Sequence, residues 1–370
     1  MPELRRVLLI QPLEGARWRS INAYALSLEQ MLSTAGVEVD VASAPWFNPP
    51  SMLRGASHRW AQQPGIRRAM SGEYDVVHLT DHALAHHVHR FEKHAAVVVT
   101  CHDLMPFTTP GYYETRREAW LKRAFLKRPI NRLSRTHVIA VSEYTRRTMV
   151  DFLGVEERAV SVVPNTVRPV FAPHDRGEAE RALSGLGIEL PGGPRILSVG
   201  NDRAYKNLPA LLRALARPAL AHASLIRVGA PVAGASRREG ERLGLLRRLT
   251  DLGHISDEVL ALVYSACDVL AQPSLGEGFG LPVIEAMAAG VPVVSSDGGA
   301  LPEVAAGAAV IVALEARDFA GAFAEGILQA MARRDDLRRL GLARAEAFAP
   351  SEVLPLLLSA YGSALNPSNT

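Results

Sequence analysis

The sequence predicts two α/β domains, each a doubly wound parallel sheet of the Rossmann-like type. Short apolar runs rich in β-branched residues recur along both halves, separated by stretches with helical periodicity. Runs of that length and composition are typical of buried parallel strands. A chain of 370 residues is also long enough for two such domains. We therefore expect two domains that face each other across a ligand-binding cleft.

The apolar runs give the predicted strands of each half. In the first half they are Val7–Ile10, Val37–Val41, Asp75–Leu79, Ala95–Thr100, Val138–Val141 and Val160–Val163. In the second half they are Ile196–Val199, Leu225–Val228, Val269–Gln272, Val291–Ser295 and Val310–Val312.

The halves are separated by a stretch rich in proline, glycine and charge, as is common between domains. We predict a first domain over 1–170, a linker over 171–194, a second domain over 195–349 and a C-terminal helix over 350–370.

The composition is that of an ordinary soluble protein. Hydrophobic residues make up 48% and charged residues 21%, and the net charge is +3. Two distant cysteines do not form a disulfide framework, and no apolar run approaches the ~20 residues that span a bilayer. We expect a cytoplasmic protein, and no nucleic-acid partner because a denser basic stripe is typical of such binders.

The most informative segment is 273–290, where three glycines at alternate positions follow a predicted strand. Pro282 suits the first turn of a helix, and Gly290 suits its end. The segment therefore predicts a strand, a glycine loop and a short helix, whose N-terminus offers N–H groups to an anion. The glycines do not follow the G-x-G-x-x-G spacing of dinucleotide sites.

Two carboxylates accompany this loop, Glu277 within it and Glu285 on the helix. A diphosphate would repel them, so they are better suited to accept hydrogen bonds from sugar and ribose hydroxyls. The alternative interpretation is a glycine turn with a solvated Glu277.

A basic pair precedes the first helix of the second domain. Arg203 and Lys206 lie in the loop between a predicted strand and the amphipathic helix that begins near Leu208. Two cations at that edge suit a diphosphate leaving group. The alternative is a pair of solvated loop cations.

Histidines mark the first domain. His102 ends a predicted strand, on the ligand side of the sheet, and Cys101 points to the opposite face. A structural His102 is the alternative. His82, His86 and His89 would share a helix face and could bind a metal, but the segment lacks His-Glu-x-x-His, and we predict no metal site.

The segment from Glu277 to Glu285, with Ala286–Val294 after it, resembles the signature of retaining GT-B glycosyltransferases of family 4, the group 1 enzymes. The resemblance implies that Glu277 contacts the donor sugar and Glu285 holds the ribose. It assigns the sugar and phosphates to the backbone amides of Gly278, Phe279 and Gly280, and Leu281 is expected to be donor-binding as well.

The same resemblance extends along both halves. Val199-Gly200 and Lys206-Asn207-Leu208 are similar to the family's phosphate-binding segment, although its arginine usually stands where this chain has Asn201 or Tyr205. The resemblance makes Lys206 and Arg203 catalytic and Asn201 donor-binding, and places Ile255 beside the nucleobase.

In the first half, Thr100–Leu104 resembles the family segment whose histidine supports the reaction, which gives His102 a catalytic role. Gly15 resembles the early loop near the phosphates and the acceptor, but Arg17–Ser20 replaces the usual glycine pair. The family also implies that the C-terminal helix crosses back to the first, acceptor-side domain.

A basic stretch with interleaved aromatics spans 116–135. It is either a solvated helix face or a surface that docks peripherally on the inner face of an anionic membrane.

Taken together, these features predict retaining transfer of a hexose, with mannose or a related sugar favoured, from a nucleoside diphosphate sugar to a hydroxyl acceptor. The acceptor would be a saccharide, a lipid-linked saccharide or a small molecule. No cofactor or metal is expected, since Asp-x-Asp is absent. The alternatives are an epimerase or phosphorylase of the same fold, or a non-catalytic sugar-nucleotide-binding subunit.

Overall fold

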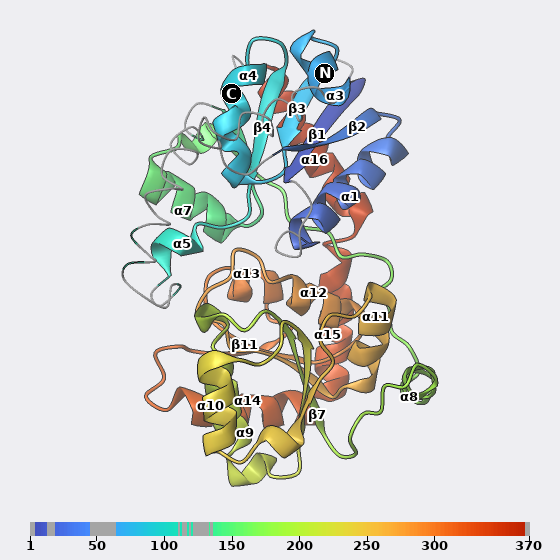
Figure 1. The fold of residues 1–370 in the computed structure, drawn as a ribbon, viewed down its shortest axis with the longest axis vertical. Helices are drawn as coiled ribbons and strands as arrows, with labels where there is room; N and C mark the ends of the chain where they lie inside the picture. Colours follow the sequence, from blue (N-terminus) through green and yellow to red (C-terminus); the bar gives the residue numbers. More distant parts are fainter. Residues whose placement is uncertain are drawn as a thin grey trace, which may run out of the picture. The chain divides into compact units, whose positions relative to one another are not determined.

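The computed structural model describes residues 4–12, 19–44, 64–109 and 136–366, with residues 112, 117, 120 and 133 between the last two ranges. The chain divides into two compact units. The first contains residues 1–107, 115–166 and 350–370, and the second contains 108–114 and 167–349. Each unit holds one six-stranded parallel sheet flanked by helices, which confirms the predicted fold class (Figure 1).

The first sheet has the strand order β2-β1-β3-β4-β5-β6. Its strands are β1 (Arg6–Pro12), β2 (Glu38–Ala44), β3 (Val76–Leu79), β4 (Ala96–Cys101), β5 (His137–Ala140) and β6 (Val160–Val162). Every predicted run of the first half is a strand. The order reverses at β1 and β3, and ligands of such sheets bind beyond the carboxyl ends of the strands.

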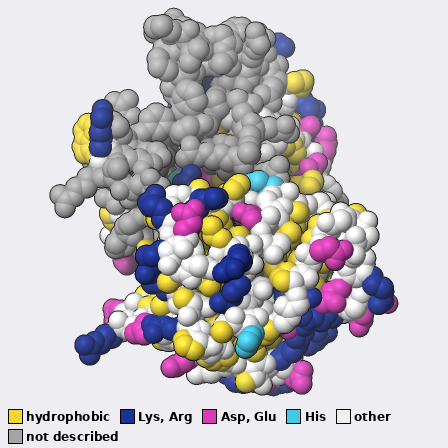
Figure 2. Space-filling model, turned by 60° about the horizontal axis from the view of Figure 1, so that its bottom comes forward, with side chains coloured by type: hydrophobic (Ala, Val, Ile, Leu, Met, Phe, Trp, Pro, Cys, Tyr) yellow, Lys and Arg dark blue, Asp and Glu magenta, His cyan; other side chains and the backbone are white. Residues whose placement is uncertain are grey.

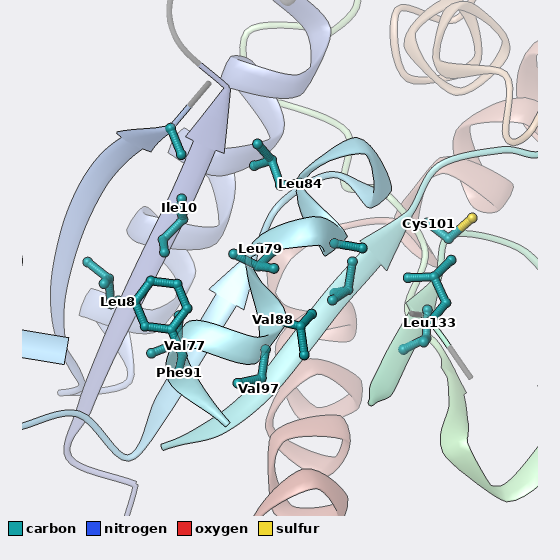
Figure 3. Close-up of a cluster of buried hydrophobic side chains, with 14 of the residues drawn as sticks. Leu8, Ile10, Val77, Leu79, Leu84, Val88, Phe91, Val97, Cys101 and Leu133 are labelled. Carbon is teal, nitrogen blue, oxygen red and sulfur yellow. The ribbon is translucent and has the colours of Figure 1, made fainter. Parts of the chain in front are cut away.

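Two hydrophobic clusters cover the two faces of this sheet, because successive side chains of a strand alternate. Leu8 and Ile10 of β1 join a cluster with side chains of α3 (Pro64–Met70), η3 (His82–His87) and α4 (Val88–Phe91) (Figure 3). Val7 and Leu9 face the other way, toward α1 (Arg19–Thr34) and α16 (Pro350–Leu365).

Helix α16 belongs to the first unit although it follows the whole second unit in the chain. It packs against β4, β5 and α1, and Leu357 and Tyr361 are fully buried. The last segment of the chain therefore completes one face of the first sheet.

The second sheet has the order β12-β11-β10-β7-β8-β9. Its strands are β7 (Arg195–Gly200), β8 (Ser224–Gly229), β9 (Leu249–Asp251), β10 (Val269–Gln272), β11 (Val293–Ser296) and β12 (Val310–Val312). Only β9 escaped the prediction, because this short edge strand, Leu-Thr-Asp, carries no apolar run. The order reverses between β7 and β10, so the loops that follow these two strands are neighbours.

Helices pack on the second sheet and on one another. A hydrophobic cluster gathers side chains of α9 (Leu208–Leu215) and α14 (Phe319–Ala332). Helix α12 (Leu281–Ala288) packs against β10 and β11, and α15 (Arg334–Glu346) packs against α12.

The stretch 171–194 differs from the expected linker, since it belongs to the second unit. It contains α8 (Arg176–Gly185), which packs against α11 (Asp257–Ala266). Arg176 Nη1 donates to Asp268 Oδ1 over 2.6 Å, and Arg195 pairs with Glu180. These two ion pairs tie the stretch to residues of the second sheet and of the loop before β10, which holds the stretch in place.

The surface of the described residues mixes charges of both signs. In Figure 2, lysine and arginine side chains form separate groups with acidic side chains among them. Among the described surface arginines, Arg213 pairs with Glu239 and Arg217 pairs with Asp318. None of the described helices is long and apolar enough to cross a membrane.

Candidate functional site

Lys206 and Glu277 meet where the strand order of the second sheet reverses. Lys206 ends η6 (Ala204–Lys206), directly after β7, and Glu277 lies in the loop after β10. The Nζ atom of Lys206 donates to Oε1 of Glu277 over 2.7 Å. Both side chains are mostly buried, so this is an ion pair sheltered from water rather than a surface contact.

The Glu277 carboxylate is held from one side. Gln272 Nε2 donates to Oε1 over 2.7 Å and Ser274 Oγ donates to it over 2.6 Å, in addition to Lys206. Within the described part of the chain, Oε2 accepts no hydrogen bond. Glu277 is 8% exposed, so one oxygen is fixed and the other is left to accept from a ligand hydroxyl.

Lys206 keeps its charge in this setting. Burial acts to lower its pKa, but the interactions with Glu277 and Tyr205 outweigh it and the pKa is raised. A protonated ammonium at the carboxyl end of β7 can stabilise an anionic leaving group.

The loop that carries Glu277 is fixed by a glycine pair after β11. A Cβ on Gly298 would lie 2.5 Å from the Ser274 carbonyl oxygen. Gly299 has a φ of +68°, and a Cβ there would lie 2.3 Å from the Glu277 carbonyl oxygen. Ala300 N donates to that oxygen over 2.9 Å. The Gly298-Gly299 dipeptide after a predicted strand was a signal that sequence reasoning missed.

The helix after the loop begins as predicted, at Leu281 with Pro282 in its first turn. Gly280 precedes it with a φ of +106°, where a Cβ would lie 2.8 Å from Leu301 Cδ2. Gly278 and Phe279 lie between Glu277 and this helix start, and Phe279 is buried with its ring edge-on to Phe348.

Glu285 lies in α12 and is engaged on both carboxylate oxygens. Tyr264 Oη donates to Oε2 over 3.0 Å, and Arg168 Nη2 lies 3.6 Å from Oε1. Burial raises the pKa of Glu285, against the opposing effects of Arg168 and Tyr264. Arg168 also pairs with Asp257. The sequence did not predict the contacts of Tyr264 and Arg168 with Glu285. Tyr264 lies in the mainly apolar helix α11, and Arg168 is far from Glu285 in the sequence.

Arg203 and Asn201 lie on the Lys206 loop but have different surroundings. Asn201 Oδ1 accepts from Arg203 N over 3.2 Å, and its Nδ2 donates to Tyr205 Oη over 3.3 Å. Arg203 is exposed, and its guanidinium makes no hydrogen bond or ion pair with the described residues. Arg203 therefore shares the loop of Lys206, but its side chain makes no hydrogen bond or ion pair with Lys206 or Glu277.

A second cation, Arg227, was missed from the sequence. It lies in β8 opposite Ser198 of β7 and is 2% exposed. Its guanidinium donates to Ser198 O over 3.2 Å, to Ser198 Oγ over 3.1 Å and to Gly200 O over 2.9 Å. Burial lowers its pKa, although Asp202 and Asp251 act against this. An arginine inside an otherwise apolar strand was the available signal.

Ile255 lies in the loop between β9 and α11 and is half-buried. The end of β8 is tied to this loop, because Gly229 N donates to Gly253 O over 2.8 Å. Ile255 is thus on the carboxyl-end side of the second sheet.

In the first unit, His102 follows β4. Its Nε2 lies 2.9 Å from the carbonyl oxygen of Thr80, the residue after β3, so Nε2 is the donor. Burial is the largest effect on His102 and lowers its pKa, which favours the neutral ring with a lone pair on Nδ1. Cys101 instead joins the hydrophobic cluster (Figure 3), and burial raises the pKa of its thiol.

The histidines at 82, 86 and 89 do not form the regular helix face considered from the sequence. Residues His82–His87 form a 3₁₀-helix and α4 begins at Val88, so the i, i+4, i+7 spacing is broken. The described residues contain no group of three or more His, Cys, Asp or Glu side chains arranged to hold a metal.

Two predicted features fall outside the described residues. These are Gly15 with Arg17 and Trp18, and most of the basic stretch 116–135, of which only Arg117, Trp120 and Leu133 are described. Trp120 is largely exposed.

Two parallel, doubly wound sheets are typical of a class of α/β proteins that bind nucleotides beyond the carboxyl ends of their strands. Family models place the chain within that class. Residues 21–171 match the model "Glycosyltransferase Family 4", and residues 193–333 match "Glycosyl transferases group 1". The chain belongs to the family 4 glycosyltransferases of group 1, with the GT-B fold.

Relatives and solved structures agree with this assignment. The chain is 32% identical to a D-inositol 3-phosphate glycosyltransferase of Nocardia farcinica over 62% of its own length, and spans 52% of that relative. It is 28% identical to O-antigen chain mannosyltransferase B of Escherichia coli, over 74% of this chain and 71% of that one.

Among solved structures, sucrose-phosphate synthase of Thermosynechococcus elongatus matches with a TM-score of 0.74 at 21% identity, over 98% of this chain and 100% of the other. HepE of Anabaena, solved with UDP and glucose, matches with a TM-score of 0.72 at 19% identity, over 98% and 100%. At such identities the likeness shows the shared fold.

Proposed function

We propose that this protein is a retaining glycosyltransferase that moves a hexose from a nucleoside diphosphate sugar to a hydroxyl acceptor. The observation that carries the proposal is the buried Lys206–Glu277 pair, 2.7 Å apart at the switch point of the second sheet. A cation and a carboxylate placed together there suit the two halves of such a donor, its diphosphate and its sugar.

The departing diphosphate would take Lys206 as its counter-charge. The N-terminus of α12 adds N–H groups and a positive dipole end close to the same loop. As the diphosphate binds, the ammonium is shared between it and Glu277, whose remaining bonds to Gln272 and Ser274 keep the carboxylate in place. Positive charge prearranged for a developing anion is often the largest single contribution to catalysis.

The sugar would be oriented by Glu277 Oε2, which has no protein donor in the described residues, and Glu285 would accept from the ribose. His102, whose neutral ring has a lone pair on Nδ1, would support the reaction, as the resemblance of its segment to the family implies. Retention follows from the likeness of the Glu277–Glu285 segment to the retaining members of family 4.

The donor is proposed to be a nucleoside diphosphate hexose, with mannose or a related sugar favoured. Support comes from two comparisons: HepE has been solved with UDP-glucose, and one relative is a mannosyltransferase. Other relatives are named D-inositol 3-phosphate glycosyltransferases. Those names support a hydroxyl acceptor of the polyol phosphate or saccharide class.

We further propose that catalysis needs no metal, because Lys206 supplies the positive charge, and that the protein works in the cytoplasm or at the inner face of the membrane. Transfer that survives excess chelator supports the first proposal, and transfer that stops and is restored by Mg²⁺ or Mn²⁺ contradicts it.

The decisive experiment has two stages. First, a thermal-shift panel of UDP-, GDP- and dTDP-hexoses identifies the donor, because a ligand that binds only the folded protein raises its melting temperature. Second, release of nucleoside diphosphate from that donor is measured with and without polyol phosphates and saccharide acceptors, and the anomeric configuration of the product is read by NMR.

The outcomes separate the candidate functions. Acceptor-dependent release with a retained configuration supports the proposal, and inversion contradicts the retaining part of it. Conversion of the donor to another sugar nucleotide without acceptor would indicate an epimerase. Formation of a sugar 1-phosphate from a saccharide and inorganic phosphate, with no nucleoside diphosphate released, would indicate a phosphorylase. Donor binding without turnover in any mixture would indicate a binding subunit.

A further inference from the structure

A chain of four buried polar side chains crosses the core of the first unit. Tyr361 Oη of α16 lies 2.8 Å from His78 Nδ1 of β3. His78 Nε2 lies 2.7 Å from Thr100 Oγ1 of β4, which lies 2.9 Å from Tyr24 Oη of α1. Tyr361, His78 and Thr100 are fully buried, and Tyr24 is 8% exposed. The chain therefore connects the last helix of the protein to its first helix through the sheet.

The direction of its hydrogen bonds follows from the protons available. Burial lowers the pKa of His78 to about 3, so the ring is neutral and has one donor and one acceptor nitrogen. If Nδ1 were the donor, the Tyr361 hydroxyl proton would have no acceptor among the described residues, at a fully buried site. Such an orphan is costly. Tyr361 therefore donates to His78 and His78 donates to Thr100, whereas either hydroxyl can be the donor in the Thr100–Tyr24 bond.

The chain ends beside His102. The rings of Tyr24 and His102 meet edge to face, with centroids 4.9 Å apart at 86°. Within the described part of the chain, the His102 ring makes one hydrogen bond, from Nε2 to Thr80 O. A single hydrogen bond fixes one point of a ring, and an edge-to-face contact with Tyr24 adds a second restraint on its orientation.

We propose that Tyr24, held through Thr100 and His78 by Tyr361, is a positioning residue that fixes the ring of His102. The C-terminal helix thereby becomes part of the active-site support, because its Tyr361 starts the chain of hydrogen bonds. The functional consequence rests on the proposed role of His102 beside the transferred sugar.

The test of geometry needs no enzymatic activity. Histidine ring signals are recorded by NMR on the full-length protein with ¹⁵N-labelled histidine, and His102→Gln assigns the signal of interest. Tyr361→Phe and Thr100→Val each remove one hydroxyl of the chain and keep the side-chain shape. Tyr74→Phe is the matched control, since Tyr74 Oη donates to Asp40 over 2.6 Å in the same unit, outside the chain.

The two chain variants are expected to shift the His102 ring signals, and Tyr74→Phe is expected to leave them in place. Having two chain variants guards against the case in which one fails to fold. Unchanged His102 signals in a folded chain variant would overturn the proposal, whatever the enzymatic activity.

Kinetics provide the second readout. Tyr361→Phe should lower kcat by roughly 10- to 100-fold at an unchanged KM for the donor, since small misplacements of a reacting group cost about that much. In a His102→Ala background the same substitution should have no further effect on kcat. Equal losses in both backgrounds would mean that the chain acts independently of His102, which would contradict the proposal. Absence of transfer in the wild-type protein would instead refute the proposed function and leave the NMR result standing.

Discussion

Lys206 and Glu277 are 71 positions apart in the chain, yet the Nζ of one lies 2.7 Å from Oε1 of the other. They meet because β7 and β10 are neighbours and the loops after them leave the same edge of the sheet. A single charged residue in the loop after one strand, Lys206 or Glu277, would not by itself indicate a binding site. Together they place opposite charges where a nucleotide is bound in sheets of this order.

Glu277→Gln should abolish transfer while nucleoside diphosphate binding survives. The amide keeps the size of the side chain but frees Lys206 from its counter-charge, so the ammonium is fully available to the diphosphate. We expect kcat to fall roughly 100-fold or more, with an unchanged or lower Kd for the nucleoside diphosphate by calorimetry. Glu315→Gln, at an exposed position, is the control. Loss of diphosphate binding in Glu277→Gln would contradict the division of roles.

Arg227 and Arg203 should differ in their effect on the donor site. Arg227 donates to the carbonyl groups of Ser198 and Gly200 at the end of β7, just before the loop that carries Lys206. Arg203, in contrast, is exposed. Arg227→Met should therefore weaken diphosphate binding more than Arg203→Met, as measured by calorimetry at two salt concentrations. The reverse order would make Arg203 the functional arginine.

Gly299→Ala should disturb the site through the backbone. A Cβ there would lie 2.3 Å from the Glu277 carbonyl oxygen, and φ is +68°. Gly307→Ala is a matched control, because Gly307 has a φ of +85° with nothing within 4 Å of an added Cβ. Both variants carry a backbone cost of roughly 1–2 kcal/mol, seen as a lower Tm. Only Gly299→Ala is expected to lose turnover as well, and equal turnover in the two would show that the Glu277 loop adapts.

His78 should make the protein sensitive to acid. Its pKa is lowered from 6.5 to about 3 by burial, so below pH 6.5 the unfolded chain binds a proton that the folded protein does not. The stabilisation is present above pH 6.5 and is lost as the pH falls toward 3, at about 1.4 kcal/mol per pH unit. Urea unfolding at pH 7 and pH 5 should show a smaller loss in His78→Gln than in the wild type.

The exposed His222→Gln is the comparison for that experiment. It should lose as much stability between the two pH values as the wild type does. An equal loss in His78→Gln would show that another group dominates the acid response.

Periodicity and glycine placement were sufficient for most of the fold. The predicted strands are strands because apolar β-branched runs are stable only when buried between helix layers. The one missed strand, β9, lies at the edge of its sheet, where little burial is needed to form it. The stretch 171–194, expected as a linker, groups with the second unit, where ion pairs such as Arg195–Glu180 depend on partners that periodicity does not reveal.

By itself, the sequence determined the two α/β sheets, the loop–helix unit around Glu277 and the membership in a glycosyltransferase family, because these depend on local spacing. Only the tertiary structure decided which side chains surround the candidate residues: Gln272 and Ser274 on Glu277, Tyr264 and Arg168 on Glu285, and Tyr24 on His102. Some of those contacts join residues far apart in the chain, and others join neighbours that a loop brings together. They form because strand order and burial, rather than sequence neighbourhood, bring the groups within hydrogen-bonding distance.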